Sequence, residues 1–214
     1  MVQKTVEKIK EEDLKEEKIE VVGEKERGIL ASISIFFLEL VKIVLLAGIT
    51  IAVVRYFLFK PFYVKGQSME PNFYEKDYLI IDELSYRFRE PNRGEVIVFR
   101  APVVQKDYYL KRIVGLPGER VKVGDGKLVV YNDDYPQGVL VEEVYLDETT
   151  TGSSMVTLGS NQYFVMGDNR DASYDSRRFG PIDESVIVGR AWVRGWPFTR
   201  ISAFGSPEYN FESR

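Results

Sequence analysis

The sequence predicts a mostly β fold, with an antiparallel, twisted, barrel-like body behind one N-terminal transmembrane helix. Two observations support this prediction. Residues 29–59 form a long apolar run, and the chain beyond residue 60 consists of short segments rich in Val, Ile, Tyr and Phe, separated by turn residues. Beyond residue 60 no amphipathic pattern reaches helical length, apart from one expected turn around 86–89.

Residues 1–28 are dense in charge and poor in aromatic side chains. Such a segment cannot bury enough apolar surface to offset the entropy of ordering, so we expect a solvated tail. Residues 29–59 carry only Glu39, Lys42 and Arg55 as charged residues. Because about 20 helical residues cross a ~30 Å hydrocarbon layer, this run is long enough to span a membrane with some tilt.

The apolar run is expected to be an uncleaved anchor, because the preceding region is too long and too acidic for a secretory signal. A buried core helix is the alternative, but a soluble helix of this length would show a polar stripe. The tail holds seven Lys and Arg residues, whereas the twenty residues after Phe59 hold three. The positive-inside rule therefore predicts a single-pass protein of the cell membrane with a cytoplasmic N-terminus and an extracytoplasmic body.

The body is assigned to residues 60–200, with a smaller β-ribbon insertion at about 118–160 and a C-terminal tail at 201–214. The GDG at 124–126, between two alternating runs, predicts a hairpin. The expected strands are FYVKG, YLIIDEL, EVIVFRAP, YYLKRIVGL, RVKVGDGKLVVYN, YFVMGD and SVIVGRAWVRGW.

The chain of 214 residues contains no His and no Cys, and its net charge is −4. These absences exclude a Ser–His–Asp triad, a thiol nucleophile, disulfides and metal sites built on His or Cys. Mild acidity gives no reason to expect a nucleic-acid partner. An enzyme with this composition must use Ser, Thr, Lys, Tyr, Asp or Glu, and we expect neither a metal nor a cofactor.

Three polar segments could carry chemistry: KGQSMEPNFYEKD, YYLKRIVGLPGE and YFVMGDNRDASYDSRRFGPI. Ser68 lies in an expected turn between Gly66 and Pro71, and Lys111 follows an apolar strand that would lower its pKa. Without His, a neutral Lys is the nitrogen base left to activate a Ser hydroxyl near neutral pH. Alternatively, the segments are an ordinary turn, an exposed strand Lys and an acidic calcium loop, although interleaved Arg residues disfavour calcium.

Together with the anchor, GQSMEP, YYLKRIVGLPGE and GDNRDASYDSRRFGPI resemble the motifs of bacterial type I signal peptidases, over about residues 35–197. The resemblance implies a serine endopeptidase that removes secretory signal peptides after small residues in an Ala-x-Ala pattern. It assigns Ser68 as the nucleophile, Lys111 as the general base and Ser173 as the hydroxyl that orients the Lys amine. The implied supporting residues are Asp175, Arg177, Gly167, Asp168 and Asn169.

The substrate pocket is expected to be shallow and apolar. By motif position it is lined by Val64, Met69, Phe73, Tyr109 and Leu110. The expected partners are signal peptides of secreted preproteins and membrane lipid, and the protein is expected to be a monomer. An extended substrate could add as a strand near the Tyr109–Lys111 edge.

Two positions depart from the family pattern. Gly66 replaces a Ser that, in some members, donates to the oxyanion, and Asn72 replaces a Thr after the Pro of the first motif. Two other functions remain open from the sequence. One is a Ser–Lys autoprotease of the self-cleaving repressor kind, and the other is an inactive or adaptor domain on a membrane anchor.

Overall fold

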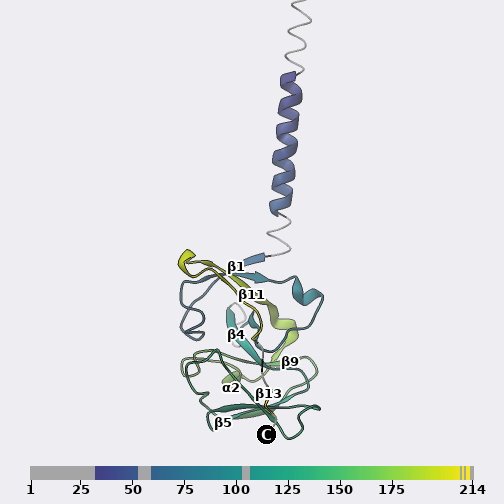
Figure 1. Ribbon diagram of the computed structural model, residues 1–214. Coiled ribbons are helices and arrows are strands. Elements are labelled where there is room, and N and C mark those ends of the chain that lie inside the picture. The colour runs from purple at the N-terminus through teal and green to yellow at the C-terminus, as the bar shows by residue number, and fades with distance from the viewer. Residues whose placement is uncertain (1–31, 53–58, 103–106, 208, 210, 213–214) are drawn as a thin grey trace, which may run out of the picture. The chain divides into compact units, whose positions relative to one another are not determined.

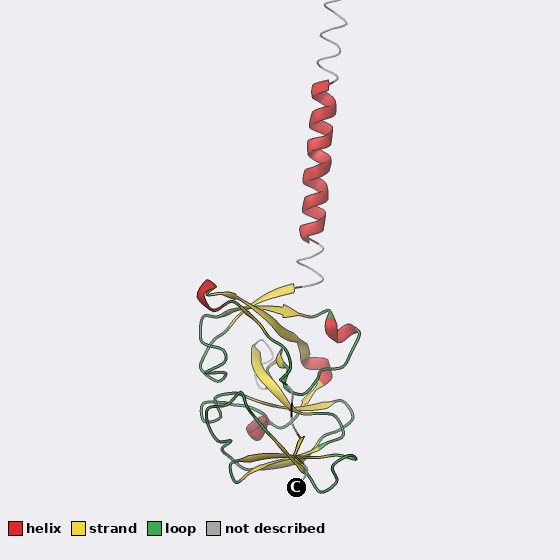
Figure 2. Ribbon diagram, viewed as in Figure 1, coloured by secondary structure: helices red, strands yellow, loops and turns green. Residues whose placement is uncertain are grey.

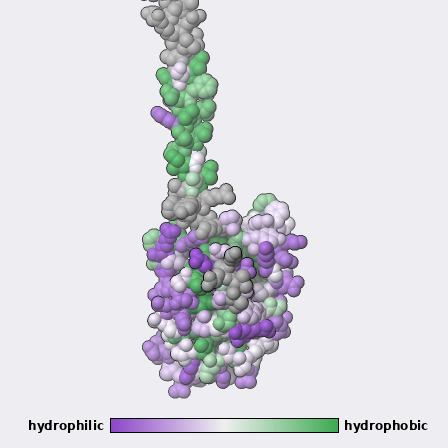
Figure 3. All heavy atoms as spheres, turned by 180° about the vertical axis from the view of Figure 1, so that it is seen from behind, coloured by the Kyte–Doolittle hydropathy of each residue, from purple (hydrophilic) through white to green (hydrophobic). Residues whose placement is uncertain are grey.

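The computed structural model describes residues 32–52, 59–102, 107–207, 209 and 211–212, and the chain divides into two units at Val53 (Figure 1). The first unit contributes one described helix, Ser32–Ala52, which is long and apolar enough to cross a membrane. All its side chains are exposed, and they form a largely hydrophobic surface in Figure 3. The expected tail at 1–28 and residues 29–31 and 53–58 of the 29–59 assignment lie outside the described residues, and Phe59, the last residue of that assignment, is the first residue of a strand.

The second unit is built on two antiparallel sheets, seen as yellow arrows in Figure 2. The larger sheet has the strand order β1-β2-β11-β3-β4-β9-β10, and β12 pairs with β11. Its strands are β1 (Phe59–Tyr63), β2 (Tyr78–Asp82), β3 (Val96–Arg100), β4 (Tyr108–Gly115), β9 (Gln162–Met166), β10 (Ile182–Asp183), β11 (Ile187–Trp196) and β12 (Ser202–Ala203). The predicted mostly β, antiparallel fold with an N-terminal apolar helix is confirmed.

The smaller sheet has the strand order β13-β7-β6-β5-β8. Its strands are β5 (Arg120–Gly124), β6 (Lys127–Tyr131), β7 (Val139–Val141), β8 (Ser154–Thr157) and β13 (Phe211–Glu212). The GDG hairpin is confirmed: Gly124 pairs with Lys127, and both Asp125 and Gly126 have positive φ, as a two-residue type I′ turn requires. The 118–160 segment thus holds four strands of one sheet, and the 201–214 segment holds β12 and β13.

Helical structure in the described part of the second unit is limited to single turns. The expected turn near 86–89 is a 3₁₀ turn, η1 (Ser85–Arg87), and two more follow at η2 (Glu184–Val186) and η3 (Phe198–Arg200). A short helix that the sequence did not predict, α2 (Ser176–Phe179), begins where the Asp175 carboxylate accepts a hydrogen bond from the Arg177 backbone N–H.

β4 and β9 lie at the centre of the body, covered on both faces. One apolar cluster joins their Val114, Phe164 and Met166 to the smaller sheet, and another packs Ile113 and Val165 against β3. Strands buried on both faces are apolar over nearly their full length, and β4 is buried from Leu110 to Gly115. Any polar side chain in this part of β4 is therefore buried, and it needs a partner.

Candidate active site

Ser68 lies in the long turn between β1 and β2. The turn closes on itself through backbone hydrogen bonds from Val64 N to Asp77 O, 2.9 Å, and from Lys76 N to Val64 O, 3.0 Å. Gly66 has a φ of +80°, in the left-handed region where glycine has no Cβ penalty. The chain therefore reverses direction just before Ser68 and leaves that side chain half-buried beside β4.

The Lys111 amine lies next to the Ser68 hydroxyl, with Nζ 2.7 Å from Oγ. It also donates to the Leu110 carbonyl oxygen at 3.0 Å. Lys111 is 4% exposed, and this burial lowers its pKa to about 8, although the negative charges of Asp175 and Asp168 act in the opposite direction. About a tenth of the amine is therefore neutral at pH 7, far more than for an ordinary Lys, and a general base must be neutral to act.

The loop after β9 packs against the back of the Ser68 turn. The Asn169 backbone N–H donates to the Ser68 carbonyl oxygen at 3.1 Å. Gly167 lies so close that an added Cβ would overlap both the Ser68 carbonyl oxygen and Ser173 Oγ. Only a residue without a side chain fits this position, so Gly167 sets the distance between the loop and the Ser68 turn.

Asp175 holds this loop from within. Its carboxylate is fully buried and accepts hydrogen bonds from the Gly167 N–H at 3.0 Å and from Arg177 Nε at 2.9 Å. Burial raises the pKa of Asp175, but the Arg177 and Ser173 side chains and the Gly167 N–H together outweigh it, so the pKa lies below its ordinary value. Asp175 is therefore ionised at neutral pH and ties α2 to the start of the loop.

Ser173 is buried at 5% exposure beside Gly167. Its side chain lies against the Asp175 carboxylate and helps to lower the pKa of that group, whereas the Lys111 amine donates to Ser68 and Leu110. Ser173 thus belongs to the loop behind the Ser68 turn, and it has no direct hydrogen bond to the Lys111 amine. The role that the family resemblance gives to Ser173 stays a prediction.

Arg112 is a site residue to which the sequence assigned no role. Its guanidinium donates to both carboxylate oxygens of Asp168, at 2.9 and 2.6 Å, and to the Gly94 carbonyl oxygen at 2.8 Å. Asn72, which the sequence marked only as a departure, donates to Asp168 Oδ2 at 2.9 Å. A charged side chain in an otherwise apolar strand was the one available signal for Arg112, because such a charge needs a buried partner.

A cleft of about 610 Å³ contains both Ser68 and Lys111. Four of the five predicted pocket residues line it: Val64, Met69, Tyr109 and Leu110. Phe73 does not line the cleft: its ring lies 4.4 Å from that of Phe204, and both residues line a separate, smaller cavity. Met69 and Phe73 are both apolar residues of the same motif, so the sequence did not distinguish the one that lines the cleft from the one that does not.

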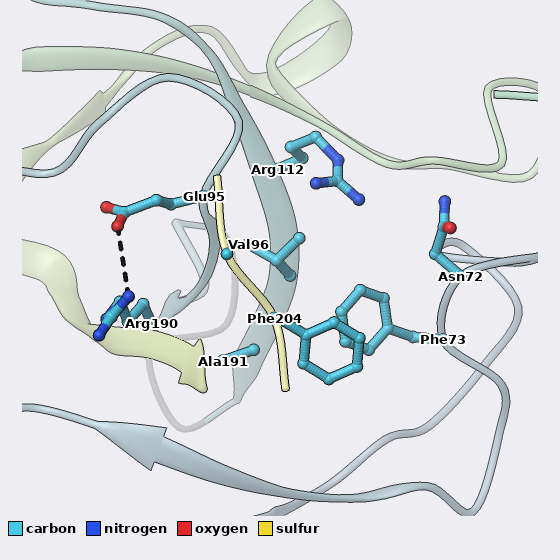
Figure 4. Close-up of a pocket in the computed structure, with 9 residues that line it drawn as sticks. Asn72, Phe73, Glu95, Val96, Arg112, Arg190, Ala191 and Phe204 are labelled. Atoms are coloured by element: carbon cyan, nitrogen blue, oxygen red, sulfur yellow. Dashed lines mark ion pairs between the residues drawn. The ribbon is translucent and has the colours of Figure 1, made fainter. Parts of the chain in front are cut away.

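A second cavity, of about 60 Å³, is shown in Figure 4 and is lined by neither Ser68 nor Lys111. Its polar side chains have partners: Glu95 accepts hydrogen bonds from Tyr86 and Arg89 and lies 3.8 Å from Arg190, and Arg112 is bound to Asp168. Among the residues that the structure describes, no group of three or more acidic side chains could hold a metal ion. The larger cleft is therefore the candidate active site.

The sequence of this chain is similar to those of several known proteins. The family described as signal peptidase, peptidase S26, matches residues 37–196. A probable signal peptidase I-2 from Synechocystis sp. is 37% identical over 171 residues, which cover 77% of this chain and 76% of the relative. A signal peptidase IB from Staphylococcus aureus is 31% identical over 186 residues, which cover 80% of this chain and 95% of the relative.

A crystal structure of a signal peptidase I from Enterococcus faecalis V583 has 31% sequence identity to this protein. Its alignment covers 48% of this chain and 97% of the other, with a TM-score of 0.41. The family match spans most of the chain and includes Ser68, Lys111 and the loop from Gly167 to Arg177. The chain therefore belongs to the signal peptidase family, peptidase S26.

Proposed function

We propose that this signal-peptide-cleaving peptidase is membrane-anchored and cuts after small residues, with Ser68 as the nucleophile and neutral Lys111 as the general base. The observation that carries the proposal is the distance of 2.7 Å between Lys111 Nζ and Ser68 Oγ, at an amine that is 4% exposed. A nucleophile and a base within hydrogen-bond reach, with the base desolvated, form a Ser–Lys variant of nucleophilic catalysis.

Acylation begins when Ser68 Oγ attacks the carbonyl carbon of the scissile peptide bond and its proton moves to Lys111 Nζ. The tetrahedral intermediate carries its negative charge on the former carbonyl oxygen. The family resemblance implies that the Ser68 backbone N–H donates a hydrogen bond to this oxygen. The C–N bond then breaks, and the Lys111 ammonium returns the proton to the leaving amine. The signal peptide is left as an ester on Ser68.

Deacylation repeats these steps with water as the nucleophile. Lys111, neutral again, takes a proton from water as the water oxygen attacks the ester carbonyl carbon. The C–O bond to Ser68 breaks, and the proton on Lys111 passes to Ser68 Oγ. The signal peptide leaves with a new C-terminal carboxylate, and no metal or cofactor is needed at any step.

An extended peptide fits the cleft because two strand edges face it. β1 is the outermost strand of the larger sheet, and β9 pairs with β4 only from Arg112 onward. Among the described strands, none occupies the β4 edge at Tyr108–Lys111 on that side. Backbone hydrogen bonds to these edges would bind substrates of many sequences. The walls at Val64, Met69 and Leu110 would admit small side chains near the scissile bond.

Membrane anchoring is proposed from the Ser32–Ala52 helix, whose length and composition suit a membrane span. In this arrangement residues 1–28 are cytoplasmic, the membrane span lies within 29–59, and 60–200 form the extracytoplasmic catalytic domain, with 118–160 inserted and 201–214 as the tail. Ser68 follows Ala52, the last described residue of the helix, by sixteen residues, so at ~3.3 Å per residue the connecting chain spans at most ~53 Å. Such a tether suits a substrate that is itself inserted in the membrane, and the site needs no second chain.

The test is cleavage of a preprotein with an Ala-x-Ala signal by the full chain in detergent. Ser68→Ala and Lys111→Met should each abolish cleavage, because they remove the nucleophile and the base. The matched control is Lys122→Met in β5, which should cleave as the wild type does. Mass spectrometry should locate the cut after the second Ala, and a Trp in its place should block cleavage. Cleavage by Ser68→Ala at a rate close to wild type would overturn the proposal.

A further inference from the structure

The connection between β7 and β8 in the smaller sheet reaches the catalytic loop. Residues 143–151 of this connection lie in the segment that was expected to be a smaller β-ribbon insertion at about 118–160. Residues of this segment form hydrogen bonds with the loop from Gly167 to Arg177 and with the Ser68 turn. The bonded residues are 20 to 73 positions apart in the sequence. Its contacts centre on one buried carboxylate, that of Glu143.

Glu143 and Arg170 form a buried ion pair. Arg170 NH1 donates to Glu143 Oε2 at 2.7 Å, and NH2 donates to Oε1, while the Arg170 side chain is 0% exposed and that of Glu143 9%. Tyr145 and Thr150 donate their hydroxyls to the same carboxylate at 2.8 and 2.7 Å. Paired geometry of this kind fixes both the position and the orientation of a guanidinium.

Arg170 transmits this position to the site. Its Nε donates to the Gly167 carbonyl oxygen at 3.0 Å. Gly167 is the residue whose Cα packs against Ser173 and the Ser68 carbonyl. The chain of contacts therefore runs from Glu143 through Arg170 to the peptide group directly behind the nucleophile.

The same segment binds the site at two further points. Arg177, which holds Asp175, donates from NH1 to the Thr151 carbonyl oxygen at 2.7 Å. Asn72, in the Ser68 turn, donates to the Tyr145 carbonyl oxygen at 2.8 Å. The segment thus contacts the turn that carries the nucleophile as well as the loop behind it.

We propose that Glu143 is a positioning residue of the peptidase: through Arg170 it holds Gly167, and with it the Ser68–Lys111 geometry. The inference rests on the proposed function, because it assigns a residue that supports that same site without touching the reacting atoms. Glu143 does not touch substrate, since none of the residues that line the cleft belongs to the 143–151 segment. Its loss should therefore affect the chemical step and leave substrate binding unchanged.

The first test is Glu143→Gln in the full chain, assayed with the preprotein substrate. The Gln side chain keeps one acceptor but presents N–H groups to Arg170, so the guanidinium loses its paired contact. We expect kcat to fall about 10- to 100-fold, as a small misplacement of catalytic groups does. KM should stay within about twofold of wild type. Glu142→Gln is the matched control: in the described part of the chain its side chain forms no hydrogen bond to the loop, and it should be fully active.

A double variant separates positioning from stability. Glu143→Gln alone leaves the Arg170 charge buried without its partner, which should lower the melting temperature. Glu143→Gln combined with Arg170→Met removes that charge and should restore much of the lost melting temperature. The double variant should nevertheless keep the low kcat, because nothing then donates to the Gly167 carbonyl oxygen. If the single variant does not fold, Thr150→Val, which keeps both charges, should show a smaller loss in kcat alone.

Recovery of kcat together with the melting temperature would overturn the inference, and so would a Glu143→Gln defect confined to KM. The Ser68→Ala chain distinguishes this failure from failure of the proposed function. If Ser68→Ala is inactive and Glu143→Gln is as active as the wild type, the positioning role alone is wrong. If Ser68→Ala still cleaves, the site itself is wrong, and the positioning role is overturned with it.

Discussion

Lys111 and Arg112 are neighbours in β4, and their side chains bind opposite sides of the site. Lys111 Nζ lies 2.7 Å from Ser68 Oγ, whereas Arg112 Nε lies 2.9 Å from Asp168 Oδ1, in the loop after β9. Successive residues of a strand point to opposite faces, so one strand can serve both contacts. The position of Lys111, the proposed base, and the position of the loop after β9 are therefore set by the same segment of backbone.

Gly167→Ala should inactivate the enzyme. The added Cβ would overlap Ser173 Oγ and the Ser68 carbonyl oxygen, and the loop would have to move away from the nucleophile turn. We expect kcat to fall by about 10²-fold, as displacement of positioned groups by ~1 Å does. Overpacking should also cost about 1–3 kcal/mol of folding free energy.

The matched control for this variant is Gly124→Ala at the end of β5, where an added Cβ meets nothing within 4 Å. Steady-state kinetics and thermal melting of both variants check the prediction. A Gly167→Ala enzyme with wild-type kcat would show that the close packing behind Ser68 has no part in catalysis.

Ser173→Ala should lower kcat by about tenfold or more and leave KM nearly unchanged, if its hydroxyl orients the Lys111 amine during turnover. The hydroxyl is buried beside the site, and its oxygen can accept a hydrogen bond from the Lys111 amine. Comparison of kcat and KM for the variant and wild type is the measurement. A defect that lies wholly in KM would instead indicate contact with the substrate.

Lys111→Met should make the folded protein more stable near neutral pH. The folded pKa of Lys111 is about 8 and the unfolded value about 10.4, so the unfolded chain binds more protons between these values. This group therefore destabilises the fold fully below pH 8, and the penalty disappears as pH rises to the unfolded pKa. At about 1.4 kcal/mol per pKa unit, the penalty is about 3 kcal/mol.

Denaturation of the full chain in detergent, from mildly acidic to alkaline pH, checks whether Lys111→Met is more stable than the wild type, as predicted. The stability difference between Lys111→Met and wild type should be largest below pH 8 and should shrink above it. The lost hydrogen bond to Ser68 offsets about 1 kcal/mol of the gain. A Met variant that is clearly less stable at neutral pH would mean that Lys111 is a charged structural residue.

Much of the fold follows from local pattern. The alternating run at 120–131 predicted the β5–β6 hairpin, because period-2 alternation and a GDG turn specify it without distant residues. The sequence did not predict β7 and β8, which have three and four residues, since such short segments carry no clear period. Nor did it predict that residues after 200 form β12 and β13, because each has only two residues and the partner of β13, strand β7, lies far away in the chain.

The contacts of the site likewise divide into those that the sequence predicted and those that depend on distant strand pairing. The proximity of Ser68 and Lys111 was predicted from chemistry and motif, since a Ser nucleophile in a chain without His needs a Lys. The pairs Arg112–Asp168 and Arg170–Glu143 span 56 and 27 residues, and they depend on which strands are neighbours. Residue type alone cannot identify such pairs, and for Glu143 the sequence carried no signal, because it is one of several carboxylates in a polar connection.

The most direct test of the Ser68–Lys111 assignment is the pH dependence of kcat/KM for the full chain in detergent. This quantity follows the protonation of essential groups in the free enzyme, and Lys111 must be neutral to act as the base. Activity should rise with pH along a single limb whose midpoint lies near 8, the pKa that burial gives Lys111, and should then level off. A rate that stays constant from about pH 6.5 to 9.5 would contradict the account, because no base with the pKa of Lys111 would then control the reaction.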